Sequence, residues 1–449
     1  MTVFESVNPA SGEVLHRAQP LAEAEVVARL DAQQRAWQLH SSLSLHERLR
    51  WLQAFGAELV SNQTALAALL TREVGKPISH SMAELEKTRQ LVDYLYRESS
   101  AALAPETLRG GVTRCWQPLG GVLGIMPWNY PIWQVCRFAL GALVAGNTVA
   151  VKPAPNVLLA TEKLAQLLAQ AGVPEGWFEV YPVAVDSVPV MYDHPHIRQV
   201  HFTGSTQAGR HIAAECGKRL LPTTLELGGS DAWLLTADGD VARFVQTALV
   251  SRMNNSGQSC LCAKRWLVPR VHLDQVLALL EAGLKRYVPQ PPEHLECHLG
   301  PLARADIVQR LVDQWQAMLP HAVRHSAALQ VSGNFVSPGW AVFEDATANP
   351  VWVQEVFGPV IQIAVYDEVS QAIAWSNASP YGLGASVWDE NETEAQQLAE
   401  QLHTANVGIN QPMRSRIDVA FGGMGDSGWG VELGHEGLRA LSRQQTQYG

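Results

Sequence analysis

The sequence predicts an α/β protein whose strands form parallel sheets. Two observations predict this class. First, short apolar runs typical of strands alternate with stretches that carry apolar residues at helical spacing. Such alternation favours a parallel sheet with right-handed crossovers. Second, the chain has 449 residues, which at roughly 150 residues per domain predicts two or three domains and a large core.

The elements are expected in the following order. Residues 20–100 are expected to be mainly helical, because residues 45–70 and 81–96 repeat apolar side chains at helical spacing. Residues 114–126 are expected to be strand interrupted by glycine. Strands are then expected at 148–151, 177–183 and 199–202, with a helix at 157–171. A second alternating block runs from about 232 to 415, and we find no repeats or flexible linkers.

Composition narrows the class of protein. Hydrophobic residues make up 47% of the chain and charged residues 17%, which is ordinary for a soluble enzyme. The formal net charge of −10 argues against a nucleic-acid partner, because such proteins usually present a basic face. It does not exclude an anionic small substrate, since one local arginine can reverse the local field.

The sequence also predicts a cytoplasmic protein without a membrane partner. The first residues lack the basic and apolar regions of a secretory signal. The best apolar run, 138–151, is interrupted by Gly146-Asn147 and is shorter than the roughly 20 residues that span a bilayer. Six cysteines are scattered without framework spacing, which indicates free thiols in a reducing compartment. Cys260-x-Cys262 has no second ligand pair nearby, so we expect no metal site.

Two residues suggest covalent catalysis. Cys260 follows Gly257-Gln258-Ser259, and Glu226 stands in Leu225-Glu226-Leu227-Gly228-Gly229. A thiolate can add to a carbonyl, and a carboxylate can then help water to hydrolyse the resulting thioester. Small residues before Cys260 would leave its sulfur accessible. Taken singly, each residue is also compatible with a structural role, as a buried cysteine and a salt-bridged glutamate.

Further motifs accompany this pair in a fixed order along the chain. They are Asn8-Pro9-Ala10-Ser11-Gly12-Glu13, Pro127-Trp128-Asn129-Tyr130-Pro131, Val151-Lys152-Pro153, Phe202-Thr203-Gly204-Ser205-Thr206, Glu355-Val356-Phe357-Gly358-Pro359 and Phe421-Gly422-Gly423. With these motifs the chain resembles the aldehyde dehydrogenase superfamily over essentially its whole length. Within the superfamily, residues 152–157 and 227–231 are most similar to bacterial succinate-semialdehyde dehydrogenases.

The resemblance implies an aldehyde dehydrogenase-like α/β fold with three parts. A Rossmann-like cofactor domain would comprise residues 1–104 and 121–227, and an α/β catalytic domain residues 228–418. Residues 105–120 would form a small β arm for oligomerisation, completed by residues 419–449, which return to it and end in the C-terminal strand. A homodimer or homotetramer is expected, although the tail ends a few residues earlier than is common in the family.

The resemblance also implies the chemistry. Cys260 would be the nucleophile, and Asn129 would donate to the oxyanion beside the backbone N–H of Cys260. Glu226 would be the general base that activates water, which favours release of a free acid over transfer to coenzyme A. Asn129 also fits a helix N-cap or turn. The alternatives for the whole protein are a dehydrogenase of neutral aldehydes and a catalytically silent member of the fold.

The cofactor is expected to be NAD, with NADP possible. The loop Gly204-Ser205-x-x-x-Gly209 follows a predicted strand and opens a helix, where N–H groups can meet a pyrophosphate. Pro155 stands where many NAD-dependent relatives carry a glutamate, so nothing there holds ribose hydroxyls or repels a 2′-phosphate. The residues implied to bind the cofactor are Trp128, Lys152, Pro155, Gly204, Ser205, Gly209, Leu227, Glu355 and Phe357.

The substrate is expected to be a short aldehyde with a distal carboxylate, and succinate semialdehyde is the leading candidate. Asn129, Trp133 and Arg137 fall at i, i+4 and i+8 and would share one helix face. The resemblance implies that Arg137 and Ser415 hold the carboxylate. The residues implied to bind substrate are Trp133, Arg137, Asn254, Ser415 and Phe421. For Arg137 the alternative is a structural ion pair.

Overall fold

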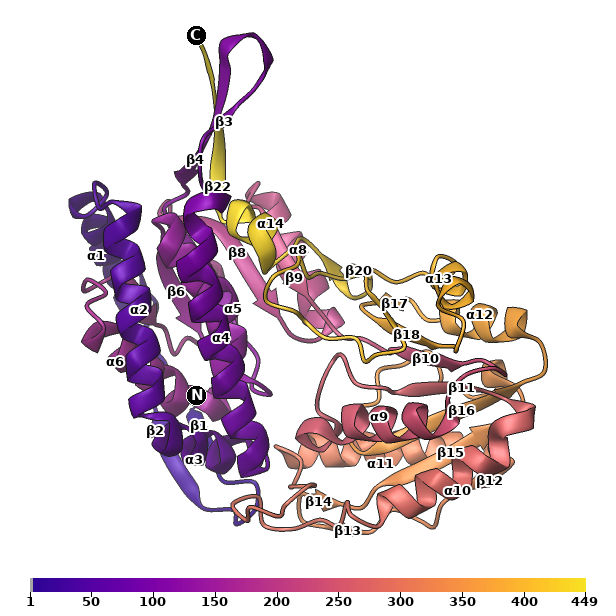
Figure 1. Ribbon diagram of the computed structural model, residues 1–449. Coiled ribbons are helices and arrows are strands. Elements are labelled where there is room, and N and C mark those ends of the chain that lie inside the picture. The colour runs from indigo at the N-terminus through magenta and orange to yellow at the C-terminus, as the bar shows by residue number, and fades with distance from the viewer. Residues whose placement is uncertain (1–2) are drawn as a thin grey trace.

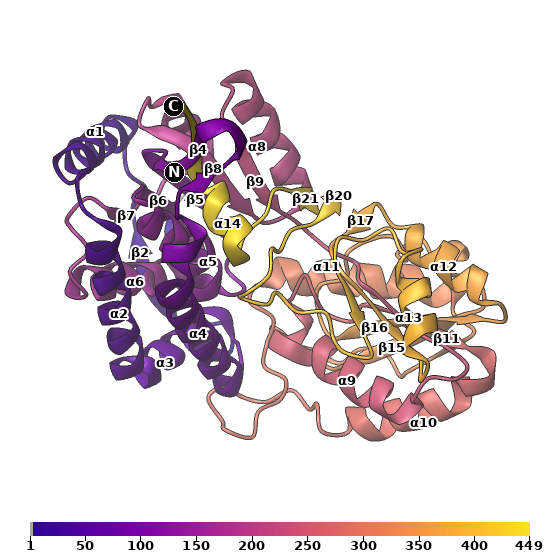
Figure 2. The same cartoon turned by 45° about the horizontal axis from the view of Figure 1, so that its top comes forward.

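A computed structural model describes residues 3–449. It has two lobes, each built on a mostly parallel sheet, and a narrow three-stranded arm that projects from the first lobe (Figure 1). The yellow C-terminal segment runs from the second lobe back across the first before it enters the arm (Figure 2). The predicted α/β class is confirmed.

The sheet of the first lobe has six strands in the order β21-β9-β8-β5-β6-β7. All neighbouring strands are parallel except β21, which is antiparallel to β9. The strands are β5 (Gly121–Ile125), β6 (Thr148–Lys152), β7 (Phe178–Val180), β8 (Ile197–Thr203), β9 (Thr223–Glu226) and β21 (Gly428–Trp429). A separate hairpin, β1 (Phe4–Val7) with β2 (Val14–Ala18), precedes them.

Helices cover both faces of this sheet because neighbouring strand residues point to opposite faces. In β6, for example, Val149 and Val151 pack into one core and Ala150 into the other. The first core contains α2 (Leu45–Ser61), α3 (Gln63–Val74), α4 (Ile78–Ala102), α5 (Pro131–Ala145) and α6 (Leu158–Gln170). The second contains α1 (Glu23–Leu39), α7 (Val188–Asp193) and α8 (Thr206–Lys218).

The predicted helical run at 45–70 is interrupted in the structure. It divides at Asn62, whose backbone N–H and side-chain amide both donate to the carbonyl oxygen of Glu58. This contact satisfies the last carbonyl groups of α2, so the chain can turn before α3 begins. The apolar spacing is the same on both sides of the break, and periodicity therefore does not reveal it.

The sheet of the second lobe has seven strands in the order β12-β15-β16-β11-β10-β18-β19, of which only β12 is antiparallel to its neighbour. The strands are β10 (Ala232–Leu235), β11 (Arg265–Pro269), β12 (Arg324–His325), β15 (Gly339–Phe343), β16 (Val360–Tyr366), β18 (Ala385–Trp388) and β19 (Val407–Ile409). Its helices are α9 (Val241–Met253), α10 (Leu273–Leu284), α11 (Ala305–Met318), α12 (Val369–Asn377) and α13 (Glu392–Ala399). Two short pairs, β13 (Val331–Ser332) with β14 (Phe335–Val336) and β17 (Tyr381–Gly382) with β20 (Met424–Gly425), complete this part of the chain.

The arm contains β3 (Glu106–Thr107), β4 (Val112–Pro118) and the C-terminal strand β22 (Ser442–Tyr448), which follows α14 (Gly434–Ala440). β22 pairs antiparallel with β4 along its whole length, from Ser442 opposite Pro118 to Tyr448 opposite Val112. The C-terminus therefore lies at the tip of the arm, beside a segment more than 300 positions earlier in the chain (Figure 1).

Candidate active site

Cys260 lies in a turn of strained backbone. The 3-10 turn before it, Asn254–Gly257, contains three residues with positive φ: Asn255 at 49°, Ser256 at 56° and Gly257 at 77°. Such angles are costly for residues other than glycine and persist only where the surrounding contacts determine them. Here the Asn255 amide donates to the Asn129 carbonyl at 2.9 Å, and the Ser256 hydroxyl donates to a backbone carbonyl at 2.9 Å.

Gly257 permits a close backbone contact. A Cβ atom on this residue would lie 2.3 Å from the carbonyl oxygen of Gly358, so no larger residue fits without movement. The Gly358 N–H donates back to the Gly257 carbonyl at 3.2 Å. The nucleophile turn and the segment that carries Glu355 and Phe357 are thus held side by side, although each belongs to a different part of the chain.

The Cys260 thiol is half-buried. Burial raises its pKa to about 12, while the positive charges of Lys264 and Arg137 act in the opposite direction. Lys264 donates to the carbonyl oxygens of Ser259 at 2.9 Å and of Cys260 at 2.7 Å. Sequence patterns had not singled out Lys264, because a lysine on its own carries no signal. The positive charge of Lys264 favours the Cys260 thiolate more than that of Arg137 does.

Asn129 points toward the nucleophile turn. Its amide N–H donates at 3.0 Å to the carbonyl of Gln258, two residues before Cys260, while its Oδ1 is buried without a partner in the described chain. The N-cap residue of α5 is Tyr130, and its side chain makes no capping bond. Asn129 is therefore not the N-cap of this helix, and its amide instead contacts the nucleophile turn.

A buried ion pair fixes the start of α5. Glu84 accepts hydrogen bonds from the N–H groups of Ile132 and Trp133, both at 2.9 Å, and its other oxygen pairs with fully buried Lys76. A carboxylate at a helix N-terminus satisfies donors that have no partner inside the helix. Lys76 also lies 3.9 Å from the Tyr130 ring centroid. These contacts hold the backbone next to Asn129 in place.

Glu226 ends β9 and is buried, with 3% of its surface exposed. Burial raises its pKa to about 8, the Arg137 charge lowers it, and Glu432 raises it. The Glu226 oxygen Oε2 lies 3.7 Å from the Arg137 guanidinium, and Oε1 has no partner in the described residues. A carboxyl group with a pKa near 8 can exchange a proton near neutral pH.

Arg137 forms ion pairs within the chain, but its terminal nitrogen Nη2 donates no hydrogen bond within the described residues. It is buried, pairs through Nε with Glu432 and faces Glu226. Glu432 also pairs with His201 at 3.1 Å. The ion pair that the sequence leaves open as the alternative for Arg137 is therefore the arrangement that the structure contains. Phe421, another expected substrate residue, packs beneath it with the guanidinium carbon 5.3 Å from the ring centroid.

Two of the other expected substrate residues, Trp133 and Ser415, lie beside Lys87, which sequence patterns missed. Lys87 Nζ donates to the Ser415 hydroxyl at 2.6 Å and lies 4.1 Å from the centroid of the Trp133 ring. Asn254, by contrast, donates to the Tyr130 hydroxyl at 3.0 Å.

The expected cofactor residues fall at the edge of the first sheet where β6, β8 and β9 end. Ser205 caps α8 by accepting from the Ala208 N–H at 3.3 Å. A Cβ on Gly209 would lie 2.5 Å from the Leu227 side chain, so only glycine permits this packing. A Cβ on Gly204 would likewise lie 2.5 Å from the Phe202 ring. Because backbone N–H groups at the start of a helix have no partner inside it, the first turn of α8 can bind an anion.

Lys152 ends β6 as a buried cation. Burial lowers its pKa to about 8, and its one hydrogen bond in the described chain goes to the adjacent Pro153 carbonyl at 3.3 Å. The nearby Asn156 amide nitrogen is buried without a partner. Pro155 contributes no acceptor side chain between them. A buried lysine with no counter-ion and an unused amide donor fit an anionic ligand such as a phosphorylated ribose.

The remaining expected cofactor residues lie beside the nucleophile turn. Glu355 accepts from the Gly229 N–H at 3.0 Å and lies 3.4 Å from Lys264. Phe357 meets Trp128 edge-to-face, with ring centroids 6.0 Å apart. These contacts connect the carboxyl edge of the first sheet with the loop that carries Cys260.

Cys262 differs from Cys260 in its surroundings. It is 1% exposed and accepts a hydrogen bond from buried Arg252 at 2.8 Å. Both thiols are free. Within residues 3–449, no cluster of three or more histidine, cysteine, aspartate or glutamate side chains is arranged for a metal ion. In the same residues no helix is long and apolar enough to cross a membrane.

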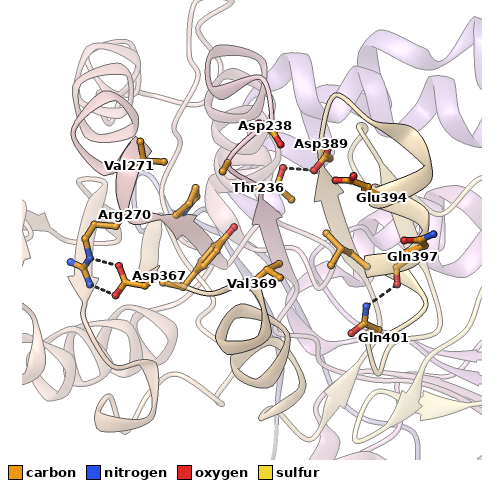
Figure 3. Close-up of a pocket in the computed structure, with 14 residues that line it drawn as sticks. Thr236, Asp238, Arg270, Val271, Asp367, Val369, Asp389, Glu394, Gln397 and Gln401 are labelled. Carbon is orange, nitrogen blue, oxygen red and sulfur yellow. Dashed lines mark hydrogen bonds and ion pairs between the residues drawn. The ribbon is translucent and has the colours of Figure 1, made fainter.

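A cavity of about 800 Å³ lies elsewhere, at the carboxyl ends of β10, β11, β16 and β18. Figure 3 shows its rim, where Arg270 pairs with Asp367 at 2.7 Å and Thr236 donates to Asp389 at 2.6 Å. None of the expected catalytic residues lines this cavity. Cavity size alone therefore does not locate the active site.

Comparison with known proteins agrees with the geometry. The Aldehyde dehydrogenase family profile matches residues 1–447. A probable NADP(+) succinate-semialdehyde dehydrogenase of Synechocystis is 33% identical over 448 residues, covering 98% of both chains. The crystal structure of the Streptococcus pyogenes succinic semialdehyde dehydrogenase with NADP+ superposes with a TM-score of 0.95 at 27% identity, covering 99% of each chain. A lactaldehyde dehydrogenase structure also reaches 0.95, at 25% identity over 100% of this chain and 95% of that one.

Proposed function

Because this chain belongs to the aldehyde dehydrogenase family, we propose that it oxidises succinate semialdehyde, or a close acid-bearing aldehyde, to the free acid. The enzyme class follows from the family. The substrate is supported by relatives named succinate-semialdehyde dehydrogenases that match the whole chain. A lactaldehyde dehydrogenase of the same fold indicates that the fold does not decide the substrate.

In the proposed reaction the Cys260 thiolate adds to the aldehyde carbon. The developing oxyanion accepts hydrogen bonds from the Asn129 amide, which already points toward the nucleophile turn, and from the Cys260 N–H. Lys264, bonded to the Cys260 carbonyl at 2.7 Å, favours the thiolate electrostatically. A bound nicotinamide supplies the acceptor for the hydride that leaves the adduct. The product of this stage is a thioester on Cys260.

Glu226 acts in the second stage. Its carboxylate takes a proton from water, and the resulting hydroxide attacks the thioester carbonyl. The C–S bond then breaks, which releases the free acid and returns Cys260 as the thiolate. A pKa of about 8 leaves part of the Glu226 population ionised at neutral pH and makes that carboxylate a stronger base than an exposed glutamate. Arg137, 3.7 Å away, holds this pKa below the value that burial alone would give. We therefore assign Arg137 a positioning role toward Glu226.

The cofactor is assigned to the first lobe, where the start of α8, Lys152 and the segment of Glu355 and Phe357 would hold it. The domain boundaries 1–104, 121–227 and 228–418 are part of this proposal, as is a homo-oligomer formed through the arm. NADP is favoured by the relatives named NADP(+)-dependent. It is also favoured by Pro155, which places no carboxylate near Lys152 to repel a 2′-phosphate.

The observation that carries the proposal is a strained cysteine turn to which Asn129 and Lys264 hydrogen-bond, with Glu226 near enough for its charge to act on the Cys260 thiol. The test is a panel of succinate semialdehyde, butanal and benzaldehyde, each with NAD and with NADP. We expect the highest kcat/KM for succinate semialdehyde. Preference for butanal or benzaldehyde would refute the substrate and leave the family activity in place. No reduced cofactor with any aldehyde would refute the activity itself.

A further inference from the structure

We propose that Lys87 is the specificity-determining residue of this site and holds the distal carboxylate of the substrate together with Ser415. The inference rests on the proposed function, since it names the residue that would select an acid-bearing aldehyde.

The position of Lys87 supports this role. It lies on α4, far in sequence from every motif of the site, and donates to the Ser415 hydroxyl at 2.6 Å. Its Nζ also lies 4.1 Å from the centroid of the Trp133 ring, on the helix that begins beside Asn129. Three segments thus meet at this ammonium group. A carboxylate placed there could accept from both Lys87 and Ser415.

Lys87 carries a positive charge that no carboxylate neutralises directly. In the described part of the chain, the Ser415 hydroxyl is its one hydrogen-bonding partner, and it makes no ion pair. Glu84, one turn earlier on α4, is already occupied by Lys76 and by two N–H groups of α5. A half-buried ammonium without a counter-ion is costly unless a ligand supplies the negative charge.

Arg137 differs from Lys87 in that carboxylates of the chain, Glu432 and Glu226, already balance its charge. The exposed Arg414, next to Ser415, adds positive charge at the same point, whereas Arg416 pairs with Asp418 at 2.6 Å and is directed to solvent. Arg137 and Arg414 thus add positive charge near Lys87, which favours an anion at this point.

This setting makes substrate binding depend on pH. Burial, together with the charges of Arg137 and Arg414, lowers the pKa of Lys87 to about 7, while Cys260 and Glu84 act in the opposite direction. Lys87 is therefore cationic below pH 7 and loses its proton above it. The KM for an acid-bearing aldehyde should rise between pH 6 and pH 8.5, because the neutral amine binds a carboxylate weakly. The KM for butanal, which has no charge, should not follow this rise.

The first test is Lys87→Met, which keeps a long unbranched side chain and removes the positive charge. We expect the ratio of kcat/KM for succinate semialdehyde to that for butanal to fall at least about tenfold, mainly through KM. Lys87→Arg restores a cation that stays charged and should recover most of the preference while flattening the pH dependence of KM. Lys285→Met, an exposed lysine at the end of α10, is the matched control and should change neither.

A binding measurement complements the kinetics. Succinate titrated calorimetrically into the enzyme at pH 6.5 should bind the wild type and Lys87→Arg, and at least about tenfold more weakly Lys87→Met. Circular dichroism establishes that each variant is folded. If Lys87→Met does not fold, the Lys87→Arg pH profile still decides the matter.

The outcomes separate the two proposals. A wild type that prefers succinate semialdehyde, together with a Lys87→Met variant that keeps this preference, overturns the role of Lys87 and leaves the proposed substrate standing. A Lys87→Arg profile as steep as the wild type also overturns it. A wild type without preference for the acid-bearing aldehyde overturns the substrate, and the role of Lys87 with it.

Discussion

Replacement of Glu226 by glutamine tests the proposed division of the reaction into two stages. The amide keeps the shape of the side chain but cannot accept the proton from water. In Glu226→Gln we expect the first turnover to form reduced cofactor as a burst, followed by a steady-state rate that is lower by a factor of at least about 100. Stopped-flow absorbance of the reduced cofactor measures both stages in one experiment.

The pKa of Glu226 sets the size of the pH effect in the wild type. With a pKa of about 8, about a tenth of the carboxyl groups are ionised at pH 7 and about nine tenths at pH 9. Because the ionised form is the base, the steady-state rate should rise about tenfold over this range and then level off. The burst rate follows the Cys260 thiol, whose pKa of about 12 predicts a continued rise.

The glutamine variant should lose the rise in the steady-state rate and keep the rise in the burst rate. Glu281→Gln, an exposed position on α10, is the control and should retain both. Loss of the burst in Glu226→Gln would mean that this residue is needed before hydride transfer, for example to deprotonate the thiol. An unchanged steady-state profile in the variant would refute the general-base role altogether.

Three further substitutions test other contacts. Gly257→Ala places a Cβ 2.3 Å from a backbone carbonyl and should lower kcat/KM about 100-fold. The control Gly333→Ala is also at positive φ but faces open space, so it should keep its activity and lose only about 1–2 kcal/mol of stability. Equal activities of the two variants would show that the cysteine turn tolerates movement. Cys262→Ala should keep most of the activity that Cys260→Ala abolishes, because Arg252 retains three carbonyl partners, and a dead Cys262→Ala would reverse the assignment. Pro155→Glu should raise the KM for NADP relative to NAD about fivefold or more through charge repulsion, and an unchanged ratio would mean that other residues set the preference.

The parts of the fold that follow from local sequence could be predicted. The strands of the first lobe and the helices between them could be predicted, because each follows from the apolar spacing of neighbouring residues. Helix α5 begins at Pro131, shortly after Asn129, as expected. The break between α2 and α3 could not be predicted in this way, because it depends on how Asn62 bonds to the preceding turn rather than on apolar spacing.

The candidate site shows the same limit. Cys260, Glu226 and Asn129 stand in recognisable motifs, but the contacts that tune them come from distant segments. The ion pair of Arg137 depends on Glu432, which a backbone bridge to Phe421 brings beside α5. Lys87 meets Ser415 across 328 positions of the chain. A lysine on an amphipathic helix is usually solvated, so no local pattern distinguishes Lys87 before the fold is known.

Mass spectrometry of the Glu226→Gln variant tests the central claim, that Cys260 forms a thioester with the aldehyde-derived acyl group. The variant is mixed with succinate semialdehyde and NADP, quenched in acid during steady-state turnover and digested. We predict a succinyl group on the peptide that contains residues 257–264, with fragmentation that assigns it to Cys260, and none on this peptide when NADP is omitted. A succinyl group on Cys262 or on another residue, or release of succinate without any acylated protein, would contradict the account.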